Sequence, residues 1–335
     1  MLLEEGLLWL FSDVVNAEIF EKSQKNIQVK CPECEQITTV HDTVAFIKAL
    51  IIKYVAQAKE LQNYRLNTIK DSTENDVEEN RLFEEIDIYN TNVLTQANNL
   101  EPISQWFEKH NIKVIFNEDA ADTTGFFDEI ALKLGNNFDV LSLVSSQIKY
   151  GQNKNFSSIK IDLSKRTPED IQKITSFCKE LYEYSFVAKY FYQKKEKIIR
   201  LTLQTVPKIR EFFNGIWMEW FTLMKLLQMF QKEKIAPACA RAFEISYNGG
   251  KTNELDIFIL TVKNIPLIIE CKSGEFRQDI DKYLSLRKQL HINKEQFIIC
   301  VFGLSDEQAK GMTSMYDLTF VNEASVIDHI QAVIR

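Results

Sequence analysis

The sequence lacks any apolar run of the roughly 18 residues that a membrane-spanning helix needs. Its two longest apolar stretches are interrupted by charge, one at Lys48 and Lys53 and the other at Glu219 and Lys225. The first residues also lack the basic segment that opens a secretory signal. We therefore expect a cytoplasmic protein with no membrane partner.

Cysteine is scarce, with six residues scattered over 335, which excludes a disulfide framework and fits a reducing compartment. Cys31 and Cys34 form a single Cys-x-x-Cys pair, and His41 follows it. A structural zinc needs four ligands, and the chain has no second Cys-x-x-Cys. The pair is therefore either part of a zinc site completed by a distant ligand or no metal site.

Other absences narrow the function. No glycine-rich phosphate loop occurs, which excludes an intrinsic ATPase and a dinucleotide-binding site. His110, His291 and His329 are isolated in the sequence, so no Ser-His-Asp or Cys-His hydrolase can be argued. The net charge of −7 speaks against indiscriminate coating of nucleic acid, but it is compatible with a local basic groove.

The chain does have enough apolar residues, 45% of 335, for two or three domains of the α/β class. Apolar spacings of three and four predict a mainly helical N-terminal region at residues 1–100, with a boundary near Pro102. A small α/β region of unknown role follows at 101–205, and a third domain occupies 206–335.

The middle region carries clear local signals. Thr167 as N-cap and Pro168 at the first position predict the start of a helix. Another helix is expected to end at Gly135, and residues 138–148 are either a strand or a buried helix. In the last domain the predicted order is a helix over 214–234, three strands, and then α, β, α, β, α.

The second and third of these strands carry charge inside otherwise apolar runs. Glu270 and Lys272 are two positions apart and therefore share one face of a strand. A turn at residues 263–264 would place Asp256 beside Glu270, whereas Glu254 lies near the strand start and is expected to reach solvent. Two carboxylates suit Mg²⁺ or Mn²⁺, which keep several waters and take substrate phosphate oxygens. A neighbouring lysine can orient or deprotonate the attacking water, so the pattern indicates phosphodiester hydrolysis.

These residues resemble the PD-(D/E)xK nuclease superfamily. "GIWMEWF", "NELDI" and "IIECKSG" are more narrowly similar to the nuclease domain of CRISPR-associated ancillary nucleases with a CARF sensor, over about residues 212–335. The resemblance implies a restriction-endonuclease-like α-β-β-β-α-β core in which Asp256, Glu270 and Lys272 are catalytic. It also implies that Asp256, Glu270, Glu219 and the Cys271 carbonyl hold the metal. The sensor is not carried over to residues 1–205, which lack its strand-led pattern.

The helix after the third strand supplies candidates for substrate binding, which are Arg277, Gln278, Lys282 and Tyr283. Gln278 and Tyr283 are one residue too far apart for the Gln-x-x-x-Tyr pattern of related nucleases. The basic residues could follow a phosphate backbone. Alternatively, they form a solvated helix face with Asp279 and Asp281 as partners.

The expected function is that of a metal-dependent endonuclease acting on DNA, with RNA as the second choice, in defence or nucleic-acid processing. A homodimer would supply the two sites that double-strand cleavage needs. Residues 1–205 would bind substrate, an effector or a protein partner. The alternative is an inactive nuclease fold that binds nucleic acid or a partner protein.

Overall fold

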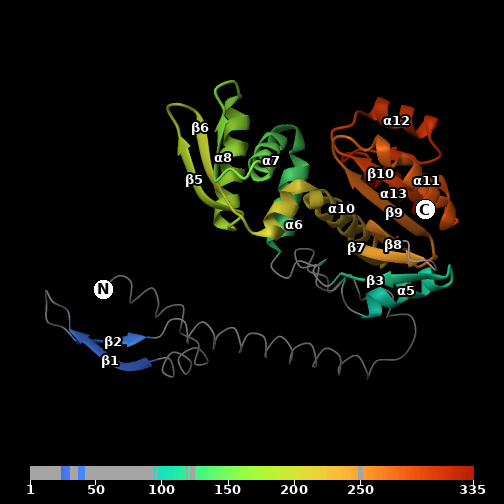
Figure 1. Cartoon of the computed structure of the whole chain (residues 1–335), viewed down its shortest axis with the longest axis horizontal. Helices are drawn as coiled ribbons and strands as arrows, with labels where there is room; N and C mark the ends of the chain where they lie inside the picture. Colours follow the sequence, from blue (N-terminus) through green and yellow to red (C-terminus); the bar gives the residue numbers. More distant parts are fainter. Residues whose placement is uncertain are drawn as a thin grey trace. The chain divides into compact units, whose positions relative to one another are not determined.

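The computed structural model describes residues 24–30, 37–41, 94, 97–117, 120, 125–247 and 252–335. The chain divides into two units, Met1–Asp76 and Val77–Arg335 (Figure 1). In the first unit, β1 (Gln24–Lys30) pairs antiparallel with β2 (Ile37–His41).

This hairpin differs from the helical expectation for residues 1–100. Ile27 and Val29 alternate with polar residues in β1, which is the period of two typical of a strand. Lys30 is opposite Ile37, so the two strands flank the segment with the Cys-x-x-Cys pair. Cys31 and Cys34 themselves lie outside the described residues, as do the helices expected on either side, and zinc binding stays a prediction.

The second unit contains a six-stranded mixed sheet in the order β11-β10-β9-β8-β7-β3. The strands from β9 to β3 are antiparallel, whereas β9, β10 and β11 run parallel. The strands are β3 (Ile112–Ile115), β7 (Ala238–Tyr247), β8 (Thr252–Leu260), β9 (Pro266–Lys272), β10 (Phe297–Val301) and β11 (Thr319–Val321).

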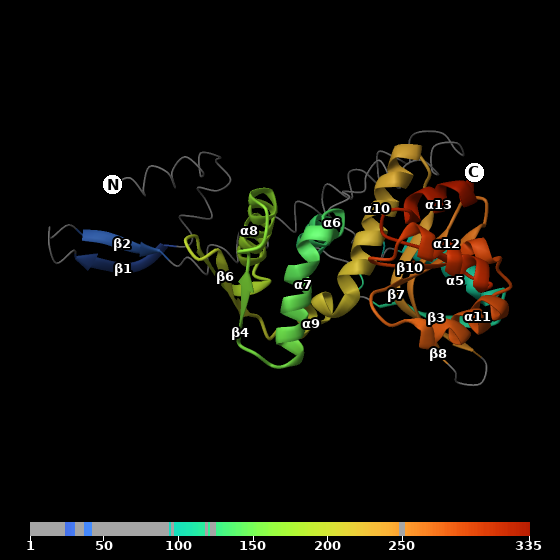
Figure 2. The same ribbon diagram turned by 90° about the horizontal axis from the view of Figure 1, so that it is seen from above.

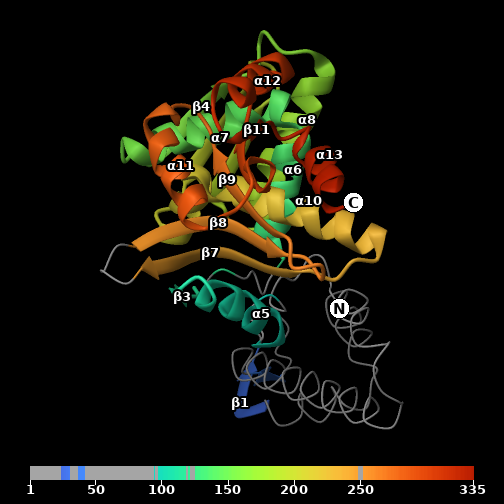
Figure 3. The same ribbon diagram turned by 90° about the vertical axis from the view of Figure 1, so that its right-hand side faces the viewer.

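Helices cover both faces of this sheet, which explains why β8, β9 and β10 are nearly continuous apolar runs. The residues of α10 (Trp217–Glu233) and α13 (Val326–Ile334) share one core with the sheet. The opposite core contains residues of α5 (Ala97–Glu108), α11 (Ile280–Gln289) and α12 (Asp306–Met315). Figure 3 shows α5 beside β3 and β7. Helix α10 is apolar on nearly all sides, as expected of a fully buried helix.

A smaller antiparallel sheet in the order β4-β6-β5 forms the middle region. Thr167 caps its long helix by accepting a hydrogen bond from the Asp170 amide at 3.2 Å, and Pro168 is the first helical residue, as predicted. Residues 138–148, for which a strand was the alternative, lie in a helix that continues to Asn153. The elements are α6 (Phe126–Asn136), α7 (Phe138–Asn153), β4 (Ser158–Asp162), α8 (Pro168–Glu183), β5 (Val187–Gln193) and β6 (Ile198–Leu203).

Helix α10 connects the two sheets, because α6 packs against the side of α10 that faces away from the large sheet (Figure 2). Gly135 was expected to end this helix, but it lies inside α6, which ends at Asn136. A Cβ atom at Gly135 would clash with the Phe221 ring, so the missing side chain permits the close approach of the two helices. One core therefore runs from Ile269 of the large sheet through Phe221 to Ile199 of β6.

The described elements from α10 onward follow the predicted order α-β-β-β-α-β-α-β-α. The assignment of β3 to the middle region is corrected, since β3 pairs with β7 and forms an edge of the large sheet. Short helices precede α10 and α11, namely α9 (Pro207–Glu211), the π-helical turn Phe212–Ile216 and the 3-10 turn Arg277–Asp279. None of the helices that the structure describes has the length and apolar character needed to cross a membrane.

Candidate active site

The site begins where β8 and β9 separate. Their pairing ends at Ile257 and Ile269, whereas β9 continues beside β10 as far as Lys272. The pairing of β7 with β8 also passes over Asp256 and its opposite residue Ala242, which has a φ of 50°. This irregularity breaks the alternation of β8, so that Leu255 and Phe258 enter the same core although they are three residues apart.

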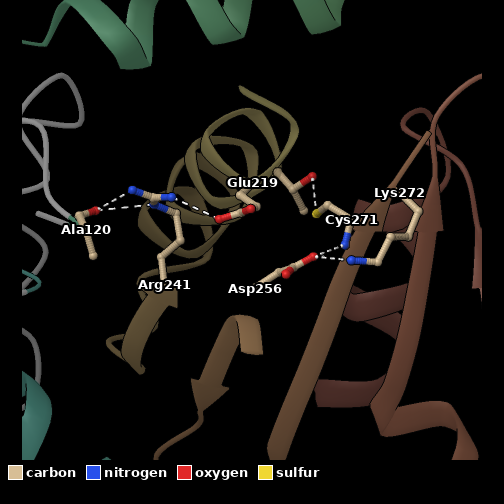
Figure 4. A network of polar contacts seen from close by, with 7 residues as sticks. Ala120, Glu219, Arg241, Asp256, Cys271 and Lys272 are labelled. Atoms are coloured by element: carbon tan, nitrogen blue, oxygen red, sulfur yellow. Dashed lines mark hydrogen bonds and ion pairs between the residues drawn. The ribbon is translucent and has the colours of Figure 1, made fainter. Parts of the chain in front are cut away.

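Asp256 occupies the gap between the separating strands. Its Oδ2 atom accepts a hydrogen bond from the Cys271 amide at 2.8 Å and another from Lys272 Nζ at 3.3 Å. Figure 4 shows both bonds reaching one carboxylate. The backbone amide and the lysine side chain of β9 therefore together orient a buried acid from β8.

Lys272 lies between two carboxylates. Its ammonium group is 3.3 Å from Asp256 Oδ2 and 3.4 Å from Glu270 Oε2. Burial alone would lower the pKa of Lys272, but the charges of Asp256 and Glu270 outweigh it and raise that pKa above its usual value. Lys272 therefore keeps its proton in this arrangement, which suits a hydrogen-bond donor better than a base.

Glu270 is buried on the face of β9 that it shares with Lys272. Burial and the neighbouring Asp256 raise the pKa of Glu270 to about 8, against the opposing charges of Lys272 and Lys282. Its Oε1 atom is buried without a hydrogen-bond partner. A buried oxygen of this kind calls for a further partner, and a water molecule or a cation would supply one.

Glu219 reaches the same region from the first turn of α10. Its Oε2 atom accepts a hydrogen bond from Arg241 at 2.9 Å. Arg241 also donates two hydrogen bonds to the Ala120 carbonyl, at 3.2 and 2.9 Å, and its guanidinium lies 3.8 Å from the Trp220 ring centre. Burial, and then the charge of Asp256, raise the pKa of Glu219 to about 7 although Arg241 opposes the shift.

Asp256, Glu219 and Lys272 border a cleft of about 420 Å³. The other lining residues are Lys149, Glu211, Asn214, Gly215, Ile216, Met218, Glu254, Cys271 and Ser273. Lys149 of α7 is held at its margin by donating a hydrogen bond to the Asn214 carbonyl at 2.9 Å. A second hollow of about 470 Å³ is lined in part by Glu219, Trp220 and Arg241, so Glu219 borders both.

The residues fit a hard cation that keeps most of its waters. Within the described ranges, no three His, Cys, Asp or Glu side chains are grouped closely enough to form a metal site by themselves. Mg²⁺ is commonly bound by only one or two carboxylates plus water and phosphate oxygens. Asp256 and Glu270, with the unpartnered Glu270 Oε1, meet that requirement.

The four predicted substrate-binding residues differ in their exposure and in their distance from the site. Lys282 is exposed on α11, and its charge is close enough to act on the pKa of Glu270. Arg277 and Gln278 are exposed, and Arg277 pairs with Glu275 at 3.2 Å.

Tyr283 was expected to contact substrate but is only 1% exposed. Its ring centre lies 5.9 Å from Lys272 Nζ, so Tyr283 supports the lysine from the core. Glu254 is exposed, as expected.

Sequence reasoning missed Arg241 and Lys149. A signal for Arg241 was present, because it is the single charge within the apolar run "PACARAF", and a buried charge requires a partner. Lys149 had no comparable signal, since it belongs to α7 in a region that the sequence assigned to another domain.

The raised pKa values of Glu270 and Glu219 predict how stability depends on pH. The unfolded carboxyls have a pKa of about 4.3, so between about pH 4.3 and 8 the folded protein holds protons that the unfolded chain has released. Stabilisation from these groups is thus present below the unfolded pKa and is lost as the pH rises through the folded values. We expect the urea midpoint, measured in EDTA, to fall from pH 5 to about pH 8.5.

Glu270→Gln should reduce this slope, whereas Glu244→Gln, which changes an exposed acid of β7, should leave it unaltered. Added Mg²⁺ should raise the midpoint more at high pH than at low pH, because the ion competes with protons for the carboxylates. A midpoint that is constant or rises across this range would contradict the assignment of protonated carboxyls at the site.

No family model matches this chain, and no curated protein matches its sequence. Several solved structures, including the following two, are similar to part of it. Protein VC1899 from Vibrio cholerae has a TM-score of 0.47 and 17% identity, over 69% of this chain and 60% of that one. Can2 from Sulfobacillus thermosulfidooxidans, solved with cyclic tetra-adenylate, has a TM-score of 0.48 and 16% identity, over 69% and 58%. The chain matches about three fifths of the length of each, and its function has to be argued from the site.

Proposed function

We propose that the chain is a metal-dependent nuclease of the PD-(D/E)xK type that hydrolyses phosphodiester bonds in DNA. The observation that carries the proposal is the convergence of Asp256 and Glu270 on the ammonium group of Lys272, beside an open cleft. A structural ion pair would be expected to satisfy its buried oxygens, whereas Glu270 Oε1 is left without a partner.

Asp256 and Glu270 would hold Mg²⁺ or Mn²⁺, with the Cys271 carbonyl as a further oxygen. When bound, the ion stabilises negative charge on the phosphate and activates water. A bound cation would lower the pKa of Glu270 against the effects of burial and Asp256, because the opposite charge favours the ionised form. The orientation of Asp256 is already set by the Cys271 amide, so its carboxylate needs little rearrangement.

Lys272 would act as a donor towards the attacking water or a phosphate oxygen. An ammonium group has three hydrogen atoms to donate, and Asp256 and Glu270 are within reach of two of them. Tyr283 also acts on this ammonium group, so a substrate oxygen would take the place of one of these acceptors. Glu219, which borders the cleft, would assist the metal, and Arg241 would position its carboxylate.

The direct test is cleavage by the purified full chain, with supercoiled plasmid and labelled single-stranded RNA as substrates. We expect plasmid cutting with Mn²⁺, none with EDTA and none by Asp256→Asn. The asparagine can still accept the hydrogen bond from the Cys271 amide, so the fold should persist, as thermal melting would verify. Glu244→Gln serves as the matched control and should cut like the wild type.

Cutting of RNA alone would retain the nuclease and change its substrate. Cutting of neither substrate, or equal cutting by Asp256→Asn, would overturn the proposal in favour of an inactive nuclease fold that binds nucleic acid or a protein. A role in defence, an effector acting through residues 1–205 and a homodimer remain predictions that this assay does not address.

A further inference from the structure

The small sheet β4-β6-β5 has one covered face and one open face. Ile159, Ile161, Ile199 and Leu201 are buried, and they enter the same core as the residues of α7 and α8. Because side chains alternate along a strand, the residues between them point to the other face. The helices thus account for one side of this sheet, and the opposite side is exposed.

The open face carries basic residues in register. Lys160 of β4 is opposite Arg200 of β6, and Arg200 is in turn opposite Phe191 of β5. All three are exposed, and 60% of Phe191 is accessible to solvent. In the next row Lys189 is opposite Thr202. A phenylalanine is therefore flanked by cations on a sheet face that none of the described helices of the middle region covers.

The turn from β5 to β6 extends this charge. Lys194, Lys195 and Lys197 are all exposed, and the Leu163 amide donates a hydrogen bond to the Lys197 carbonyl at 2.8 Å, which fastens the turn to the end of β4. Lys165 lies near the same edge, where its charge acts on Asp162. We call this surface the basic sheet face; it consists of Lys160, Lys165, Lys189, Phe191, Lys194, Lys195, Lys197 and Arg200.

The basic charge of this face is not balanced locally. Only Asp162 and Glu196 are acidic in the three strands and the β5–β6 turn, and Asp162 is engaged by the Ser164 amide at 2.8 Å. Among the described residues, none of the cations of the basic sheet face forms an ion pair. Like charges directly opposite each other, as Lys160 and Arg200 are, destabilise a sheet. Their concentration in a chain of net charge −7 requires a different explanation, which a polyanionic ligand would supply.

We propose that the basic sheet face binds a single strand of nucleic acid. Lysine and arginine neutralise phosphates along a backbone, and an exposed aromatic ring on a sheet offers a surface on which an unpaired base can stack. The ring of Phe191 would stack on a base, and the cations Arg200, across the sheet, and Lys189, two residues earlier in β5, would bind the adjoining phosphates. A duplex would engage the lysines but leave Phe191 without a base, so the arrangement favours a single strand.

The test measures binding without cleavage, as fluorescence anisotropy of labelled oligothymidylate with the full chain in EDTA. Combined replacement of Lys194, Lys195 and Lys197 by glutamate should weaken binding at least tenfold and reduce the salt slope by about 2. Phe191→Ala should weaken binding by about 5- to 150-fold with little change in that slope. Unaltered binding in either variant would overturn the proposal.

Matched controls distinguish the effect of this surface from the effect of the chain's overall charge on binding. Glutamate at Lys109, Lys263 and Lys310, which are exposed elsewhere on the chain, should weaken binding far less than the turn variant, and Tyr182→Ala on α8 should bind like the wild type. Equal weakening by the control triple, tighter binding of a duplex, or binding to phosphatidylserine vesicles instead of oligonucleotide would each overturn the proposal.

The inference does not depend on the proposed nuclease activity. If the chain binds the oligonucleotide through Phe191 but does not cut plasmid, the binding proposal stands and the nuclease proposal fails. If the chain cuts plasmid but binds equally well after the Phe191 and lysine replacements, the nuclease proposal stands and the binding proposal fails.

Discussion

Replacement of Lys272 by methionine should lower the cleavage rate by about 10²–10³-fold, the range typical of losing one preorganised hydrogen-bond donor at the reacting centre. Methionine has a similar length and no branch at Cβ, so it can follow the same path through the half-buried site. What is lost is the ammonium group between Asp256 and Glu270, which would donate a hydrogen bond to the substrate.

The folded state should tolerate this change near neutral pH. Glu270 already has a pKa raised to about 8, and removal of the neighbouring cation would raise that pKa further. Glu270 would then hold its proton instead of leaving a second buried charge beside Asp256. Retained melting temperature together with lost cleavage would therefore assign a chemical role to the ammonium group.

The measurement is single-turnover plasmid cleavage at saturating Mn²⁺, which separates the chemical step from product release. Lys263→Met is the matched control, because Lys263 is exposed in the turn of the same hairpin, and it should cleave at the wild-type rate. If Lys272→Met cleaved within a few-fold of the wild type, or if both variants lost the same activity, Lys272 would have no role in the reaction.

Arg241→Met should destabilise the fold by about 3–5 kcal/mol, the usual cost of removing one partner from a buried ion pair. The variant loses the bond to Glu219 and the two bonds to the Ala120 carbonyl. Glu219 would then face Asp256 without a compensating cation. The free energy of unfolding should be measured by urea titration at about pH 8, where retaining a proton on Glu219 is itself costly.

A double variant distinguishes charge from packing. Glu219→Gln in the Arg241→Met background should recover a large part of the lost stability, because no uncompensated carboxylate remains. Arg277→Met, which breaks an exposed pair with Glu275, should cost less than about 1 kcal/mol. A loss in Arg241→Met no larger than in Arg277→Met would show that the buried pair contributes little. A full loss in the double variant would assign the effect to the Ala120 and Trp220 contacts.

The order of elements and the acid and lysine positions could be predicted because both follow from local periodicity. Glu270 and Lys272 share a strand face wherever that strand lies, and Thr167 with Pro168 begins a helix by its own chemistry. Asp256 was expected beside Glu270 from a regular hairpin. The observed contact instead depends on the two strands separating after Ile257 and Ile269, and alternation of apolar residues does not reveal where pairing stops.

The remaining features depend on partners distant in the sequence. The stretch "NIKVIF" at residues 111–116 has the composition of a strand, but a strand pattern does not state which neighbour it will pair with, and β7 lies over a hundred residues later. Arg241 and Glu219 are 22 positions apart on different elements. Gly135 carried the usual signal of a helix end, yet its place is determined by the ring of Phe221.

Through the contact between Gly135 and Phe221, α10 joins helix α6 to the cleft of the large sheet. Phe221 meets α6 on one side of the helix, and Glu219, two residues earlier, borders the cleft with Asp256. Packed interiors transmit small displacements because they contain little empty space, and here even a methyl group would not fit. We therefore expect a displacement of α6 to move Phe221 and, with it, Glu219 on the same helix. The small sheet and the carboxylates of the large sheet are thus in contact with the same helix.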